Sequence, residues 1–357
     1  MMKLKLKEFC TIAGLLSILL TSTAHAETVL SWTDGAPNRG TRADATIWMA
    51  EELAKRTNGE LKMEFHWGGA LMKFKAATKG IGAGAADMGL MVAIYNPKLH
   101  LGYTIADLPT KYSDPWVGTR SIYELVMNNE ELQKEFHKLN LQYISNITTT
   151  QIEMICKDKV VRDLDDIKGL KVRGISIYGK VLADLGAIPV GMPSSGAYQG
   201  LSTGLIDCTL MYGYAIPAFK LQEVGNEFTR LDWGALMSMA YVMNKDVFDA
   251  LTPEQQEIIL QLGSDFVDHY AEKIIAGNAK AYELMAAGTD GKNKVNFHEI
   301  SPEAKAELEK ATQPYVEVWR KEAEEGGIDA NAMQRQFHEL LKNYDDERKS
   351  KGYPWNR

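Results

Sequence analysis

The stretch that decides the fold is DDIKGLKVRGISIYGKVLADLGAIPVGMPSSGAYQGLSTGLID, residues 165–207. It predicts a short apolar strand that ends at Arg173, a helix, a second strand over 187–192, another helix, and a strand starting near Ile206. Strands that alternate with helices build a mainly parallel sheet. Ligands of such sheets bind beyond the carboxyl ends of strands, which is where Arg173 falls. Its guanidinium could hold a carboxylate through two parallel hydrogen bonds, although a surface arginine at a strand end would give the same pattern.

Several motifs follow one another in a fixed order along the chain. K-G-L-K-V-R (168–173) precedes L-G-A-I-P-V-G-M-P (185–193), a Tyr-containing helix, and T-G-L-I-D (203–207). Upstream lie E-E-L-A-K-R-T-N-G (51–59) and a segment, 80–89, that ends in A-A-D-M-G. Together they resemble the solute-binding subunits of TRAP transporters, the DctP family, over essentially the whole mature chain.

The resemblance implies a fold, a site and partners. The fold would be α/β and like that of periplasmic binding proteins, with two α/β lobes joined by crossing strands and closing on a solute. In this family the arginine of the K-x-R motif grips the substrate carboxylate, and Arg173 matches that position. The partners would be a small organic solute and integral membrane permease subunits. The soluble subunit would be no enzyme and would carry no cofactor.

Two positions depart from the family pattern. Many members carry a second arginine on the preceding strand, where a gap-free count lands on Glu153. The family's ligand-contacting Asn after the T-G-x-x-D motif is replaced by Met211. If Glu153 faces the cleft, it could pair with Arg173 or accept hydrogen bonds from an ammonium or hydroxyl group. These changes favour a zwitterion, a hydroxylated monoacid or a small amine over a dicarboxylate, unless Glu153 points to solvent.

Aromatic side chains follow the strand ends of both halves of the chain. Aromatic walls commonly line small-ligand sites, and stacked rings can also hold a cation. We therefore expect these residues around one crevice, together with the polar Ser194 that follows the G-M-P segment: Trp32, Trp67, Tyr95, Tyr212 and Tyr214.

The chain divides into two lobes and a C-terminal part. We expect residues 27–150 and 236–280 to form the first lobe, residues 151–235 the second, and residues 281–357 helices that pack on both. A helix from Pro253 to about Ala287 is long enough to span the two lobes. Lobes joined by crossing strands suit hinge closure around a ligand.

The amino terminus predicts export. Three lysines precede an apolar run over residues 12–20, and Thr23-Ala-His-Ala26 supplies an A-x-A cleavage pattern. This predicts a signal peptide over residues 1–26, cleaved after Ala26, and a periplasmic protein. Because the leader carries three Lys and one Glu, the mature net charge becomes −9 from the −7 of the full sequence. An acidic chain of this kind argues against nucleic acid as a partner, and we expect a monomer rather than a dimer.

Catalytic and metal-binding signatures are missing from the sequence. There is no G-x-S-x-G elbow, P-loop or clustered acidic loop, so no metal site is expected. A secreted enzyme acting on a small acid would need a base and a nucleophile that converge in the cleft, for example Glu153 with Ser176 or Cys208. A receptor for an ABC importer or a sensor kinase would share the fold. Cys156 and Cys208 are either buried thiols or a single bridge.

Overall fold

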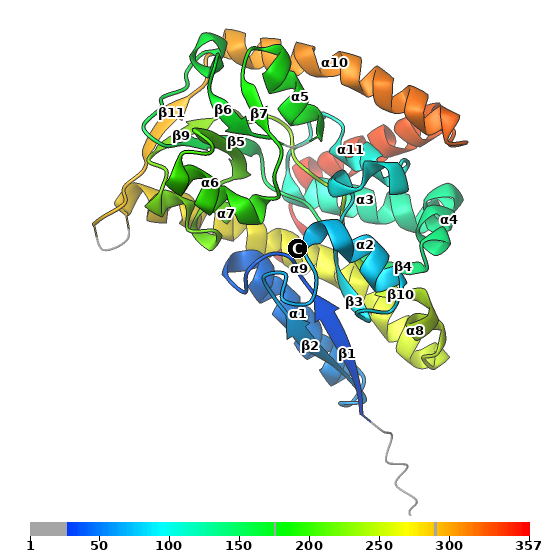
Figure 1. Ribbon diagram of the computed structural model, residues 1–357. Coiled ribbons are helices and arrows are strands. Elements are labelled where there is room, and N and C mark those ends of the chain that lie inside the picture. Colours follow the sequence, from blue (N-terminus) through cyan, green and yellow to red (C-terminus); the bar gives the residue numbers. More distant parts are fainter. Residues whose placement is uncertain (1–26, 175, 289–290) are drawn as a thin grey trace, which may run out of the picture.

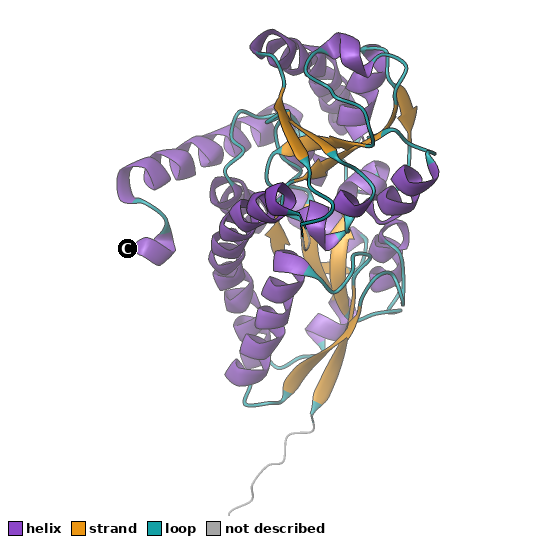
Figure 2. Ribbon diagram, turned by 90° about the vertical axis from the view of Figure 1, so that its left-hand side faces the viewer, coloured by secondary structure: helices purple, strands orange, loops and turns teal. Residues whose placement is uncertain are grey.

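The computed structural model of the chain describes residues 27–174, 176–288 and 291–357. The expected signal peptide therefore lies outside the described residues. Figure 1 shows two lobes, one above the other, and each lobe is built around one β-sheet. Figure 2 shows helices packed along both sheets. This is the two-lobed α/β architecture that the sequence predicts.

The first lobe contains a five-stranded sheet in the order β2-β1-β3-β10-β4. Its first three strands run parallel, whereas β10 lies antiparallel between β3 and β4, so the sheet is mixed. The strands are β1 (Thr28–Thr33), β2 (Leu61–His66), β3 (Met88–Val92), β4 (Leu141–Ile147) and β10 (Met239–Asn244). The helices of this lobe are α1 (Gly40–Arg56), α2 (Phe74–Gly82), α3 (Pro115–Asn128), α4 (Glu130–Lys138) and α8 (Lys245–Asp249).

The second lobe contains a six-stranded sheet in the order β11-β9-β5-β8-β6-β7. β6, β7 and β8 are parallel, as residues 165–207 predict, and β5 is antiparallel to β8 and β9. The strands are β5 (Ile152–Cys156), β6 (Lys171–Arg173), β7 (Ile188–Val190), β8 (Cys208–Tyr212), β9 (Glu227–Arg230) and β11 (Asn296–Glu299). The helices are α5 (Ser176–Asp184), α6 (Ala197–Thr203) and α7 (Ala215–Ala218).

A disulfide settles the question that the sequence leaves open about the two cysteines. Cys156 and Cys208 face each other in the register of β5 and β8, with their Cα atoms 4.0 Å apart, and they are bridged. The bridge fixes β8 beside β5 in the middle of the second sheet. β8 also carries Leu210, whose carbonyl accepts a hydrogen bond from Arg173.

Two extended segments join the lobes, residues 148–151 before β5 and residues 231–238 before β10. They are hydrogen-bonded to each other, since the Thr149 N–H donates to the Leu236 carbonyl at 2.8 Å and the Ile152 N–H to the Gly234 carbonyl at 3.1 Å. The lobe boundaries expected at residues 150 and 235 fall inside these segments. Paired connections of this kind can bend together when two lobes close.

The long helix α9 (Pro253–Ala287) passes along both lobes (Figure 1). It begins as the sequence predicts, with a capping box in which Thr252 and Gln255 satisfy each other's backbone N–H groups and Pro253 occupies the first turn. It packs closely on the first lobe, because a Cβ atom at Gly263 would lie 2.0 Å from the Ile144 carbonyl oxygen. Only glycine fits that contact, so the helix is fixed to β4.

The C-terminal region differs in one respect from the expected set of helices. β11 pairs with β9 as an edge strand of the second sheet, so residues 281–357 also supply part of a lobe. A four-residue strand carries too little periodicity to be recognised in the sequence.

The two C-terminal helices follow, α10 (Pro302–Glu325) and α11 (Ala330–Lys351), and α10 crosses from the second lobe to the first. Its Tyr315 hydroxyl donates to Asp184 in α5, and its Trp319 indole donates to the Leu101 carbonyl at 3.0 Å. Among the described residues, no helix is both long and apolar enough to span a bilayer.

Candidate functional site

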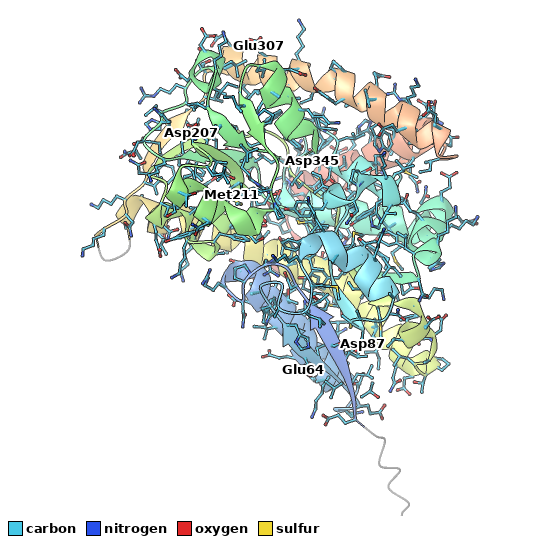
Figure 3. All side chains as sticks on the ribbon, in the orientation of Figure 1. Glu64, Asp87, Asp207, Met211, Glu307 and Asp345 are labelled. Atoms are coloured by element: carbon cyan, nitrogen blue, oxygen red, sulfur yellow. A yellow bond between two sulfur atoms is a disulfide. The ribbon has the colours of Figure 1, made fainter. Side chains whose placement is uncertain are left out.

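A narrow cavity lies between the two lobes. Its volume is about 60 Å³, which is room for only a few water-sized molecules. Met211 lines it from the second lobe, on the side that faces the first (Figure 3). The walls are largely apolar and aromatic, and they include Phe74, Leu90, Val92 and Tyr95 from the first lobe and Ser194, Met211, Tyr212, Tyr214 and Phe219 from the second.

Arg173 does not line this cavity but contacts Tyr95, which does, and it is buried, with 1% of its surface exposed. It ends β6, and its side chain is held by two backbone carbonyls of its own lobe. Nε donates to the Met192 carbonyl at 3.1 Å and Nη1 to the Leu210 carbonyl at 2.9 Å. Among the described residues, no carboxylate lies within ion-pair distance of this guanidinium. A buried cation without a countercharge is costly, and an anionic ligand would supply one.

Tyr95 connects Arg173 to the opposite lobe. It ends a 3-10 turn, Ala93–Tyr95, directly after β3. Its hydroxyl oxygen accepts from Arg173 Nη2 at 3.5 Å and from the Ser194 N–H at 3.2 Å. Its ring stacks on Phe74, with the ring centroids 5.8 Å apart. The structure therefore brings Tyr95, Ser194 and Arg173 together from two lobes.

A second buried arginine, Arg42, lines the same cavity from α1, and the sequence reasoning missed it. Its Nη1 forms an ion pair with the fully buried Asp34, and its Nη2 donates to the Pro37 carbonyl at 3.0 Å. Burial disfavours the charged guanidinium, but the Asp34 carboxylate and the surrounding buried tyrosines together outweigh this, so the pKa of Arg42 is raised. The signal available in the sequence was a pair of opposite charges eight residues apart, where a strand gives way to a helix.

Glu153 does not approach Arg173. It is 1% exposed, and its carboxylate accepts the backbone N–H groups of Leu231 at 2.5 Å and Asp232 at 3.0 Å. It does not line the cavity. Burial raises the pKa of Glu153 to about 8, although the two N–H groups favour its charged form. The expectation that it pairs with Arg173 or receives a ligand is therefore not met; it holds one end of the segment 231–238.

Asp107 holds the other end of the same segment from the first lobe. Its carboxylate accepts the backbone N–H groups of Met237 at 3.2 Å and Ser238 at 3.1 Å, and the Ser238 hydroxyl as well. Burial raises the pKa of Asp107 to about 6. The connection between the lobes is thus anchored by one buried carboxylate in each lobe.

The predicted aromatic residues divide between the cavity and its surroundings. Tyr95, Tyr212 and Tyr214 line the cavity, and the last two rings stack with centroids 5.9 Å apart. Trp32 is fully buried in the core of the first lobe, where Tyr241 packs against it. Trp67 is half-buried and lies outside the cavity. The Arg42 guanidinium carbon lies over its ring, 5.4 Å from the ring centroid. Strand-end position alone did not separate a core ring from a wall ring.

The arrangement gives little support to a catalytic site. Cys208 is bridged to Cys156, so it offers no thiol nucleophile. The side chain of Ser176 lies outside the described residues. Within the described ranges, no group of three His, Cys, Asp or Glu side chains is placed to hold a metal ion.

Related sequences include bacterial solute-binding proteins. The C4-dicarboxylate-binding periplasmic protein DctP of Rhodobacter capsulatus is 26% identical over 274 residues, 74% of this chain and 78% of that protein. A solute-binding protein of Albidiferax ferrireducens is 28% identical over 223 residues, 60% of this chain. The aligned stretch spans 64% of the Albidiferax protein, slightly under two thirds of its length.

Solved structures share the fold at low sequence identity. A TRAP solute-binding protein from Rhodoferax ferrireducens, in complex with copurified benzoate, has a TM-score of 0.80 at 20% identity over 89% of this chain and 99% of that one. A TRAP periplasmic solute-binding protein from Bordetella bronchiseptica with bound mandelate has a TM-score of 0.79 at 19% identity, with coverage of 89% and 99%. The family model for bacterial extracellular solute-binding proteins, family 7, matches residues 34–322. The chain belongs to this family, the DctP family.

Proposed function

We propose that this chain is the periplasmic receptor of a TRAP-type transporter and that it captures a small organic carboxylate between its lobes. The observation that carries the proposal is the buried Arg173, which the protein anchors with two carbonyls but gives no carboxylate partner among the described residues. A solute carboxylate would supply that charge through short, charge-assisted hydrogen bonds. The loaded receptor would then deliver the solute to membrane permease subunits.

The walls of the cavity, rather than its present volume of about 60 Å³, favour a compact monocarboxylate with an apolar or aromatic body. Its walls are mainly apolar, and its buried second cation, Arg42, is already paired with Asp34. A dicarboxylate would therefore find one buried anchor rather than two. The argument for a small amine weakens, because Glu153 lies outside the cavity and is bonded to backbone N–H groups. The acids bound by the Rhodoferax and Bordetella proteins, benzoate and mandelate, are of the favoured type.

Closure of the lobes would be the working step. The cavity is formed by both lobes, so a solute contacts all of its walls only when the lobes are together. A solute stabilises the closed form by its additional contacts there and by no other means. The paired segments 148–151 and 231–238 are where the bending would occur.

The test uses the mature chain, residues 27–357, purified from a periplasmic extract, in which mass spectrometry should find Glu27 at the amino terminus. Thermal shift and calorimetry are run with benzoate, mandelate, pyroglutamate, galacturonate and succinate. Arg173→Met should weaken binding of the best acid by about 100-fold or more, since it removes a buried charge partner. The matched control is Arg162→Met, at an exposed arginine. Equal affinity of Arg173→Met and the wild type would overturn the proposal.

A further inference from the structure

Tyr95 stands between the cavity and Arg173. The cavity is lined by Tyr95 and Ser194 but not by Arg173. Two of the three guanidinium nitrogens are engaged by carbonyls of the second lobe, and Nη2 is directed at the Tyr95 hydroxyl. The hydroxyl therefore lies between the cavity that a solute would occupy and the guanidinium nitrogen that would bind its carboxylate.

We propose that the Tyr95 hydroxyl takes the place of a solute carboxylate oxygen and holds the lobes together until a solute displaces it. The oxygen accepts from two donors of the second lobe, Arg173 Nη2 and the Ser194 N–H, while its own residue belongs to the first lobe. The inference rests on the proposed function, because it takes Arg173 as the carboxylate anchor. It adds a competitor for that anchor within the protein itself.

The two hydrogen bonds are weak enough to be exchanged. Their lengths, 3.5 Å and 3.2 Å, exceed the 2.7–2.9 Å that is typical of bonds between a cation and a carboxylate. A carboxylate oxygen also brings the negative charge that a neutral phenol lacks. Tyr95 is half-buried and lies outside β3, at the end of a short turn.

Such a latch sets a minimum binding free energy that a solute must supply before it can occupy the site. A neutral molecule that fits the aromatic walls would have to displace the hydroxyl without offering Arg173 a better partner. An anion forms charge-assisted hydrogen bonds with Arg173, and their free energy offsets the loss of the hydrogen bonds that the Tyr95 hydroxyl makes. Tyr95 would therefore be a specificity-determining residue, because it sets a threshold that carboxylates pass and neutral aromatic compounds do not.

The first experiment measures lobe separation without any solute. Spin labels are placed on cysteines introduced at two exposed positions, Ala70 in the first lobe and Ser202 in the second, while the native cysteines stay bridged. Tyr95→Phe should increase the mean distance between the labels and broaden its distribution. The matched control is Tyr198→Phe, whose hydroxyl bonds to Glu223 within the second lobe. An unchanged distance in Tyr95→Phe would overturn the latch.

The second experiment measures binding of benzoate, with benzamide as the neutral probe. Tyr95→Phe should bind benzoate about fivefold more tightly, since one competing hydrogen bond of ordinary strength is removed. Benzamide should gain by a similar factor, since both probes must displace the same hydroxyl. Weaker benzoate binding would show that the hydroxyl contacts the solute, and would overturn the proposal. If benzoate binds none of the proteins, the solute class is wrong, and the label distances still decide on the latch.

Discussion

Arg42 in the first lobe and Arg173 in the second are both buried arginines beside the same cavity, and they are neutralised in different ways. Arg42 is 9% exposed and forms an ion pair with the fully buried Asp34. Arg173 is 1% exposed and has two carbonyls and a phenol as partners, with no carboxylate among the described residues. The charge of Arg42 is balanced by a carboxylate of its own lobe. The charge of Arg173 faces only the partial negative charges of carbonyl and hydroxyl oxygens.

The difference separates a structural cation from a binding cation. A buried ion pair whose partners are fixed has no need of a ligand, and removing one partner leaves an uncompensated charge. A buried cation held by carbonyls alone remains available to an external anion. Burial of an arginine therefore does not identify a site unless its countercharge is also located.

The largest expected effect is on the structural pair. Arg42→Met leaves the Asp34 carboxylate buried and unpaired, so the free energy of unfolding should fall by about 3–5 kcal/mol. Urea titration of the ligand-free mature chain at neutral pH measures the loss. The double variant Asp34→Asn with Arg42→Met removes both charges and should recover a large part of it. Wild-type stability in Arg42→Met alone would contradict the structural role.

A buried carboxyl group, that of Glu153, extends the comparison to an acid whose hydrogen-bond partners are backbone N–H groups. Its pKa is raised to about 8 in the folded chain, so the folded protein holds a proton that the unfolded chain releases near the ordinary pKa of a Glu. The stability this supplies is complete below that ordinary value and is lost as the pH rises toward 8. Wild type should therefore lose stability relative to Glu153→Gln by on the order of 1 kcal/mol per pH unit between pH 5 and 8.

Unfolding of both proteins in urea at several pH values measures this slope. Asp107→Asn is the matched control, because Asp107 anchors the other end of the segment 231–238 and its pKa is raised only to about 6. The difference in free energy of unfolding between Asp107→Asn and the wild type should stop changing with pH above about pH 6. Parallel curves for wild type and Glu153→Gln would show that Glu153 is ionised in the fold.

The sequence predicts the architecture well because the relevant signals are local and periodic. The strands of residues 165–207, the crossing of the chain after residue 150, and the cap and length of α9 all follow from short-range patterns. The motif aspartates have local roles as well. Asp207 accepts the Lys171 N–H at 2.7 Å and Asp87 accepts the Ser31 N–H at 2.7 Å, so both tie neighbouring strands together. The sequence does not predict β11, because a four-residue edge strand is recognised only by its pairing with β9.

The candidate site is predicted less completely, because its properties depend on partners distant in the sequence. Position at a strand end predicts that Arg173 and Tyr95 lie near each other, and the structure has them in contact, with Tyr95 lining the cavity. It cannot show that the Glu153 carboxylate accepts hydrogen bonds from N–H groups 78 and 79 residues away. It also cannot separate Trp32, whose ring belongs to the core, from Tyr212, whose ring lines the cavity.

The smallest expected effect completes the comparison between the two arginines. Arg173→Met removes a cation that has no carboxylate partner among the described residues, so no buried countercharge is left behind. The substitution removes the desolvation penalty of a buried charge. The carbonyls of Met192 and Leu210 lose a donor, which costs about 1–3 kcal/mol each and offsets much of that gain. We therefore expect the free energy of unfolding of the ligand-free chain to change by about 1 kcal/mol or less. The same substitution at Arg42 should cost several times more in the same urea titration. If the two variants are equally destabilised, Arg173 is structural, and the solute must be held elsewhere.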